Sequence, residues 1–272
     1  MTTQSLRRDR AGRFDLRTWK PGDIDPYLPI YPDALFDLLS RELSLPERPL
    51  VVDVGAGTGR ASLAMTRLGW HVAVVEPDGP GLDVLRARAA AEGLEVATVH
   101  ATAEETGLEQ ASVDLVTAAH AFHWFNKRAA LAEMARVTRP GGGVALFWNV
   151  RDRERSPFVA DYHSILERHG VAKRLYLEAE RASGRATREA LARAEGLDSP
   201  RLHRVWHEMA MRSDEFMELC FAPGFVRAFS SERQDAFRAD IVELLADHGF
   251  DGEAPVTIPY RIDCWIATRS IP

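Results

Sequence analysis

The stretch "VVDVGAGTGR" (51–60) joins an apolar run to a turn with three glycines. The run 50–54 has the length and β-branched residues of a buried strand, and residues 60–69 read as a helix that stops at a glycine. A glycine turn between a strand and a helix has three possible uses. It cradles the phosphates of a dinucleotide, receives a nucleoside cofactor without phosphate, or is only a tight connection.

The same alternation of strand and helix extends outward from this stretch. Further strands are expected at 71–76, 94–100, 112–120 and 143–149, and helices at 33–43, 81–93 and 127–142. Strands that alternate with helices predict a mostly parallel sheet. We therefore expect an α/β fold with a Rossmann-like, seven-stranded sheet and helices on both faces. In such a fold, ligands bind beyond the carboxyl ends of the strands.

The chain outside this core has a different pattern. Residues 1–32 are expected to form an N-terminal arm or strap, loosely ordered over 1–20, and 33–150 the core. Residues 151–200 are charged and helical, which predicts a helical cap inserted after the fifth strand. Residues 201–272 are expected to supply the remaining strands, an edge strand at 201–212 and a final strand at 256–269, together with further cap helices. Pro259 is expected to keep the first half of that final strand out of a central position.

The bulk composition excludes several classes of protein. The chain has 272 residues, 46% of them hydrophobic, and a net charge of −6, which gives no general attraction to nucleic acid or an anionic membrane. No apolar run reaches about 18 residues, and the N-terminus has no signal-peptide core. Only two cysteines, Cys220 and Cys264, are present, without metal-ligand spacing. We expect a cytoplasmic protein, a monomer or homodimer, with no resident metal.

The residues around the turn distinguish among its possible uses. A dinucleotide fingerprint needs a third glycine where this chain has Arg60. Asp53, just before the turn, is a poor neighbour for a pyrophosphate and a good one for an ammonium group. Glu76, at the end of the next strand, suits a ribose diol, because a carboxylate accepts two hydroxyl hydrogen bonds. These features together favour S-adenosylmethionine.

At this point the chain resembles a known family, the class I S-adenosylmethionine-dependent methyltransferases. The likeness is to the subgroup of trans-aconitate methyltransferase-like enzymes that act on small molecules, and it covers roughly residues 25–269. The segments that carry the resemblance follow the family's order along the chain: "YLPIYP", "VVDVGAGTGR", "VVEPD", "ATAEETGLEQASVDLV", "AAHAFHWFN", "RPGGGVALFWN" and "IPYRIDCWIATR". Thr102 stands where many relatives have Asp.

The resemblance implies a cofactor site made from several loops. The residues it implies are Asp53, Gly55, Ala56, Gly57, Gly59, Glu76, Pro77, Thr102, Ala103, Glu104 and His120. The glycine backbone would pack against the methionyl part, Asp53 would support its amino end, and Glu76 would bind the ribose. Pro77 would flank the adenine, residues 102–104 would border its edge, and His120 would lie near the methionyl group.

Candidate residues for the methyl acceptor follow the fourth and fifth strands. We expect His120, His123 or Tyr31 to act as catalytic residues, since methyl transfer needs a general base only if the acceptor must lose a proton. The side chains expected to bind the acceptor are Tyr27, Trp124, Phe125, Trp148, Asn149 and Arg151. For the histidines and tyrosines, plain packing is an equally open interpretation.

The sequence therefore favours an enzyme that transfers a methyl group to an oxygen or carbon of a small molecule, such as a secondary metabolite or carboxylic acid. A second hypothesis is a cofactor-binding protein of the same fold that no longer methylates, and instead catalyses a cyclisation or rearrangement or acts in regulation. A nicotinamide oxidoreductase is a third hypothesis, which Arg60 disfavours.

Overall fold

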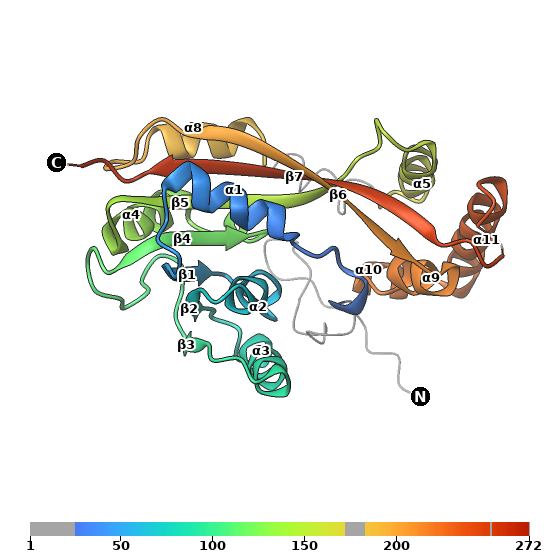
Figure 1. The fold of residues 1–272 in the computed structure, drawn as a ribbon. Coiled ribbons are helices and arrows are strands. Elements are labelled where there is room, and N and C mark those ends of the chain that lie inside the picture. Colours follow the sequence, from blue (N-terminus) through green and yellow to red (C-terminus); the bar gives the residue numbers. More distant parts are fainter. Residues whose placement is uncertain (1–24, 172–182, 251, 272) are drawn as a thin grey trace.

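The structure is a computed structural model that describes residues 25–171, 183–250 and 252–271. Residues 1–24 of the predicted arm, including the segment expected to be loosely ordered, lie outside the described residues. In the described part the chain forms one seven-stranded sheet in the order β3-β2-β1-β4-β5-β7-β6 (Figure 1). The strands are β1 (Leu50–Val54), β2 (His71–Val75), β3 (Ala97–Val99), β4 (Val113–Ala119), β5 (Thr138–Arg151), β6 (Arg201–Met211) and β7 (Val256–Thr268).

Strand direction matches the predicted fold class. Strands β1 to β5 pair in parallel, whereas β7 runs antiparallel to both β5 and β6. Pairing of β7 with β5 begins at Tyr260, while pairing with β6 extends to Val256. Pro259 therefore lies in the part of β7 that has a strand on one side, as predicted. The Rossmann-like α/β fold with helices on both faces is confirmed.

Helices cover both faces of the sheet. Successive residues of each strand point to opposite faces, and both faces carry apolar side chains that must be buried. Val51 faces one core together with α1 (Asp33–Leu43), α2 (Arg60–Arg67) and α3 (Gly79–Glu92). Val52 faces the other core, with α4 (Lys127–Val137) and α8 (Arg185–Ala192). The position of α8 differs from the expected cap insertion: its buried Leu191 packs on the sheet face beside α4.

A third core lies beyond the sheet and forms the cap. It is built from α5 (Pro157–Arg168), α9 (Ser213–Phe221), α10 (Gly224–Arg227) and α11 (Ser231–Asp247), together with the ends of β6 and β7. In Figure 1 these helices lie at the right, the end toward which the β4 arrow points. The cap thus stands at the carboxyl ends of the parallel strands, where ligands bind in open α/β sheets.

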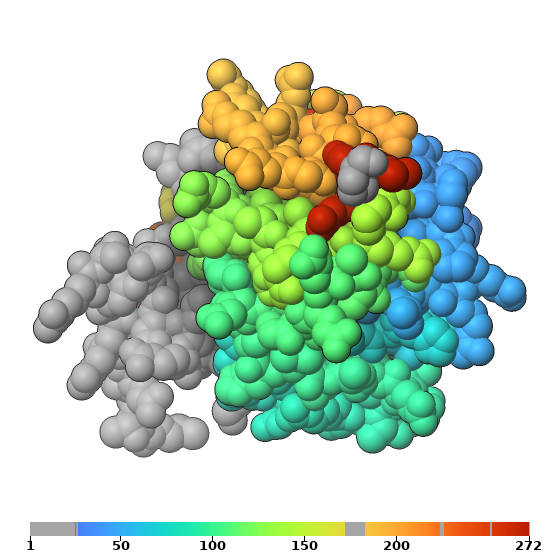
Figure 2. Space-filling view, turned by 90° about the vertical axis from the view of Figure 1, so that its left-hand side faces the viewer, coloured from blue at the N-terminus to red at the C-terminus, as the bar shows by residue number. Residues whose placement is uncertain are grey.

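The opposite end of the molecule is closed by the C-terminal residues. Figure 2 shows the red end of the chain emerging beside orange residues near 200. Backbone hydrogen bonds connect the two segments, from Asp198 N–H to the Thr268 carbonyl (2.9 Å) and from Ser270 N–H to the Gly196 carbonyl (3.0 Å).

The largest error in the predicted elements concerns the start of β5. The helix expected over 127–142 ends at Val137, and the strand expected at 143 begins at Thr138. The Thr138 hydroxyl donates to the Met134 carbonyl (2.7 Å) and closes the helix end. The glycine segment then enters the sheet, where a Cβ on Gly142 would stand 2.5 Å from the Asp114 carbonyl oxygen. Strand β3 is also shorter than the predicted 94–100.

Candidate functional site

The glycine turn (residues 55–59) requires its three glycines for different reasons. Gly55, Gly57 and Gly59 all have positive φ angles, of 69°, 54° and 84°. A Cβ on Gly55 would meet Ala121 and Phe125, and one on Gly59 would meet Leu85. A Cβ on Gly57 would meet no atom of the described chain within 4 Å. Gly57 is therefore the point at which the turn is open to an approaching ligand.

Asp53 lies beneath the turn and does not line it. Its side chain is fully buried, and its two carboxylate oxygens accept hydrogen bonds from the hydroxyls of Ser62 (2.6 Å) and Thr117 (2.7 Å). Burial raises the pKa of Asp53, the hydrogen bonds from Ser62 and Thr117 oppose that rise, and with the nearby Glu76 charge the pKa is about 6. These hydrogen bonds connect β1 to α2 and β4, so the predicted support of an amino group by Asp53 would act through them.

Glu76 directly follows β2 and lies next to the glycine turn. One carboxylate oxygen accepts from the Gly57 N–H (2.7 Å) and the other from the Asp78 N–H (2.9 Å). Asp78 in turn caps α3 by accepting from Gly81 N–H (2.9 Å), and Pro77 is exposed. The predicted acid is thus fixed beside the open glycine.

The loop after β3 brings its three predicted residues to the same end of the sheet. Ala103 is buried, Thr102 is exposed in a bridge with Glu105, and a Glu104 oxygen accepts from the Asn126 N–H (2.7 Å). Ala56 in the glycine turn is partly buried against the first core. Ala103 therefore packs in the second core, while the Glu104 carboxylate is hydrogen-bonded at the start of α4.

His120 and His123 form a pair after β4. His120 has a positive φ of 55°, rare for a residue with a side chain, and its ring lies edge-on to that of His123 with centroids 5.6 Å apart. The His120 side chain is accessible to solvent, although protein atoms surround much of the ring. Burial lowers the pKa of each ring to about 4, and the neighbouring His120 and Lys127 charges add to the effect at His123. Both rings are therefore neutral at pH 7.

The aromatic residues around this pair lie at different depths. Phe125 covers Gly55, and Trp124 is 60% exposed, so both are accessible to an acceptor or to the turn. Trp148 was expected to bind the acceptor, but it is fully buried in the second core. Its indole N–H donates to Nδ1 of His123 (3.5 Å). Trp148 therefore acts on the site only through the histidine.

A strap formed by residues 25–31 crosses the end of the sheet next to the turn. The Arg60 guanidinium donates to the backbone carbonyls of Asp25, Leu28 and Pro29. Arg88 forms an ion pair with Asp25 (2.8 Å). The sequence argument used Arg60 only to exclude a dinucleotide, so this clasp on the strap was missed.

The tyrosines of the strap have structural surroundings. Tyr31 packs edge-on against Phe147 (5.1 Å between centroids) in the first core, and burial raises the pKa of its hydroxyl. A phenol with a raised pKa is a poor proton acceptor near neutral pH, so Tyr31 does not fit its predicted catalytic role. Tyr27 is partly buried and packs against the cap core.

Asn149 and Arg151, at the end of β5, connect neighbouring segments. The Asn149 amide donates to the Ile30 carbonyl of the strap (3.2 Å), and its oxygen pairs with Nε2 of His207 (2.7 Å). Arg151 donates to the Tyr260 hydroxyl (3.3 Å) and lies over the Tyr162 ring. Asn149 and Arg151, which were predicted to bind the methyl acceptor, therefore connect the strap, the sheet and the cap.

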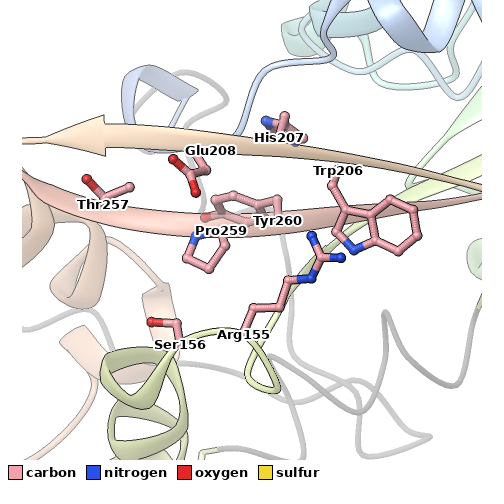
Figure 3. A pocket seen from close by; sticks show the side chains of 8 residues that line it. All are labelled: Arg155, Ser156, Trp206, His207, Glu208, Thr257, Pro259 and Tyr260. Carbon is pink, nitrogen blue, oxygen red and sulfur yellow. The ribbon is translucent and has the colours of Figure 1, made fainter.

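A cavity of about 380 Å³ opens beyond the end of β5 (Figure 3). Its lining residues are Arg155, Ser156, Trp206, His207, Glu208, Thr257, Pro259 and Tyr260. In Figure 3 the Arg155 side chain extends toward Trp206, and its guanidinium lies 4.8 Å from that ring. Its residues come from the β5–α5 loop and two strands far apart in sequence, so no local motif predicts it.

The described part of the chain contains neither a metal-binding cluster nor a membrane-spanning helix. Among residues 25–171, 183–250 and 252–271, no group of three or more His, Cys, Asp or Glu side chains is placed to hold a metal ion. No helix in the same ranges has both the length and the apolar character that crossing a membrane requires.

Parts of the chain are similar to known proteins. Residues 52–146 match a family described as "Methyltransferase domain". An uncharacterized methyltransferase of Mycobacterium tuberculosis is 42% identical over 120 residues, which are 44% of this chain and 47% of that protein. An uncharacterized methyltransferase-like protein of Schizosaccharomyces pombe is 32% identical over 164 residues, 58% of this chain and 61% of that protein. The chain thus spans about half to three fifths of the length of these relatives.

Solved structures share the architecture over nearly the whole chain. A protein of Anaeromyxobacter dehalogenans described as a type II methyltransferase superposes with a TM-score of 0.68 and 27% identity, covering 90% of this chain and 99% of that one. The YcgJ protein of Bacillus subtilis gives a TM-score of 0.52 at 19% identity, covering 89% of this chain and all of that one. The chain shares the Rossmann-like α/β fold of these structures, and its residues 52–146 are similar to the methyltransferase domain family.

Proposed function

We propose that this chain is an S-adenosylmethionine-dependent methyltransferase that transfers a methyl group to an oxygen or carbon of a small molecule. The observation that carries the proposal is the pairing of Gly57 with Glu76 in the matched domain. The one glycine of the turn without a neighbour at its Cβ position lies against an acid at the end of the adjacent strand. An open backbone beside a carboxylate suits a ribose diol.

The residues present fit the proposed cofactor. A carboxylate has about four lone-pair sites, and Glu76 uses two for the amides of Gly57 and Asp78. The remaining sites are available to two ribose hydroxyls. The open side of Gly57 would admit the methionyl part.

The chain's own residues would then orient the acceptor and exclude water. When bound, the cofactor supplies an electrophilic methyl group on a sulfonium that is already a good leaving group, so placement of the acceptor contributes much of the rate. The neutral ring of His120 can accept a hydrogen bond, or a proton, from an acceptor hydroxyl, whereas the acceptor nitrogen of a neutral His123 is already bonded to the Trp148 N–H. The strap, clasped by Arg60, would exclude water from this end of the sheet.

The acceptor class is proposed from the subgroup that the sequence motifs resemble. The trans-aconitate methyltransferase-like subgroup, to which the motifs are similar, favours a small acceptor. The exposed ring of Trp124 and the accessible His120 would face it. Neither Trp148 nor Tyr31 would touch it, because both lie in the cores.

The proposal is tested by turnover with a panel of small acceptors. The purified chain is incubated with S-adenosylmethionine and with carboxylic acids or hydroxylated compounds, and S-adenosylhomocysteine is measured by mass spectrometry. We expect acceptor-dependent release of S-adenosylhomocysteine and a product heavier by one methylene. Binding of S-adenosylmethionine without release of S-adenosylhomocysteine for any acceptor would instead support a protein of this fold that no longer methylates.

A further inference from the structure

The two edges of the sheet differ in length and in protection. Strand β3 ends one side with only three residues, Ala97–Val99, whereas β6 ends the other with eleven, Arg201–Met211. The register between β6 and β7 is unbroken along all eleven, and β6 contains neither proline nor glycine. Within the described ranges β6 pairs only with β7. Short strands, prolines and bulges are the usual protection against edge pairing, and β6 has none of them.

One face of β6 is fixed within its own chain. His203 lies 3.6 Å from Glu42 of α1, His207 pairs with Asn149 at 2.7 Å, and Met209 packs against the cap core. These contacts hold the strand from its middle to its end. The edge is therefore a rigid template, which lowers the entropic cost of adding another strand.

The other face of β6 exposes apolar side chains between charges. Leu202 is 38% exposed and Trp206 is 46% exposed, at alternate positions of the same face. Arg204 remains 48% exposed while its Nε donates to Asp263, and Glu208 is exposed. Arg155 stacks on Trp206 from the same chain. An extended edge with exposed apolar residues is a predicted site of strand pairing.

The sequence of this face is complementary to itself. If two copies of β6 pair antiparallel about a two-fold axis at Trp206, Arg204 of each copy lies opposite Glu208 of the other. Opposite charges directly across an antiparallel pair stabilise it, and like charges destabilise it. Centring the pair on Arg204 or on Glu208 would put that charge opposite itself. Placing the two-fold axis at Trp206 thus gives the register in which Arg204 and Glu208 form both opposite-charge pairs.

We propose that β6 is a homodimer interface, in which a second copy of this chain adds its own β6 antiparallel with Trp206 facing Trp206. The resulting sheet is continuous across both copies, and the interface is isologous. Eleven residues at about 3.4 Å each give an interface strand on the order of 37 Å long.

The register is tested by disulfide trapping. Cys220 and Cys264 are buried, so an engineered surface cysteine is the reactive thiol among the described residues. Residues directly opposite across strands have Cβ atoms about 5 Å apart, within reach of a disulfide after small adjustment. We expect Trp206→Cys to form a covalent dimer under mild oxidation. Leu202→Cys, which would lie opposite Ala210, is the matched control and should stay largely monomeric on a non-reducing gel.

The charge pairs are tested by sedimentation of charge-reversed variants. We expect the wild type to sediment as a dimer at micromolar concentration and Glu208→Arg to weaken dimerisation at least tenfold. The double variant Arg204→Glu/Glu208→Arg should restore the dimer, and Glu243→Arg, an exposed change on α11, should leave it intact. Melting temperatures of all variants show whether each is folded. A wild type that remains monomeric, or a dimer that neither Glu208→Arg nor the choice of cysteine position affects, would overturn the proposal.

Discussion

A substitution at Gly57 is expected to affect ligand affinity much more than it affects the stability of the fold. An alanine there must adopt a φ of 54°, which costs on the order of 1 kcal/mol, and its Cβ enters space that no described atom fills. We expect Gly57→Ala to lower the free energy of unfolding by about 1 kcal/mol and to weaken S-adenosylhomocysteine binding at least tenfold. Denaturant unfolding and calorimetry measure the two effects.

Gly69 provides the matched control for that experiment. It also has a positive φ, of 83°, and no neighbour within 4 Å at its Cβ position, but it ends α2 away from the turn. Gly69→Ala should cost similar stability and leave affinity unchanged. Equal losses of affinity in the two variants would contradict the assignment of Gly57 as the open side of the cradle.

His120 and His123 should stay neutral well below the usual histidine range. Their pKa values of about 4 are lower than the ordinary 6.5, so the unfolded chain takes up these protons first as pH falls. These two groups therefore reduce the stability of the folded state progressively from about pH 6.5 down to pH 4. NMR titration of the imidazole carbons should show midpoints below pH 5. Midpoints at 6 or above would show that the surrounding protein does not lower the pKa of either ring.

At the scale of elements, the strap depends on α2 for its position. Arg60→Ala removes the charged donor from three strap carbonyls, and such bonds contribute about 1.5–3 kcal/mol each at most. We expect a loss of about 2–4 kcal/mol of stability, protease cleavage within residues 25–31, and weaker cofactor binding. Arg67→Ala on the same helix is the control. Its exposed ion pair with Glu92 should contribute no more than about 1 kcal/mol, with no new cleavage.

The helices and strands also show which sequence patterns were sufficient to predict secondary structure. Apolar runs such as 50–54 and 71–76 gave correct strands, because burial on both faces leaves a distinctive pattern. The run at Pro140 and its glycines was misassigned to the end of a helix. Its true position depends on contact with the Asp114 carbonyl and Leu43, residues distant in sequence. Periodicity contains no information about such a contact.

At the scale of the whole molecule, the cap core is separate from the glycine turn. Phe216 is fully buried among Phe158 and Tyr162 in that core. Phe216→Ala should cost about 3–5 kcal/mol of stability, and S-adenosylhomocysteine affinity at a temperature where the variant is folded should change less than threefold. The exposed Val242→Ala on α11 is the control, with a stability change within about 0.5 kcal/mol. A large loss of affinity in Phe216→Ala would show that the cap shapes the cofactor site.

The site as a whole was only partly predictable. The glycine turn and Glu76 could be predicted from the sequence because they belong to one strand-turn-helix unit and to the strand beside it. Asp53, Tyr31 and Trp148 were placed at the correct end of the sheet, yet their side chains point into cores or toward hydroxyls. Whether a polar or aromatic residue lines a site or supports it depends on neighbours such as Ser62 and Thr117, which sequence spacing does not reveal.

Calorimetric titration with S-adenosylhomocysteine tests the central claim most directly. If the glycine turn holds a methionyl nucleoside, the wild-type chain should bind S-adenosylhomocysteine with one site and micromolar or tighter affinity. Gly57→Ala should bind it at least tenfold more weakly, while Gly69→Ala binds as the wild type does. Absence of S-adenosylhomocysteine binding by the folded wild type, together with tight binding of a nicotinamide dinucleotide, would contradict the account.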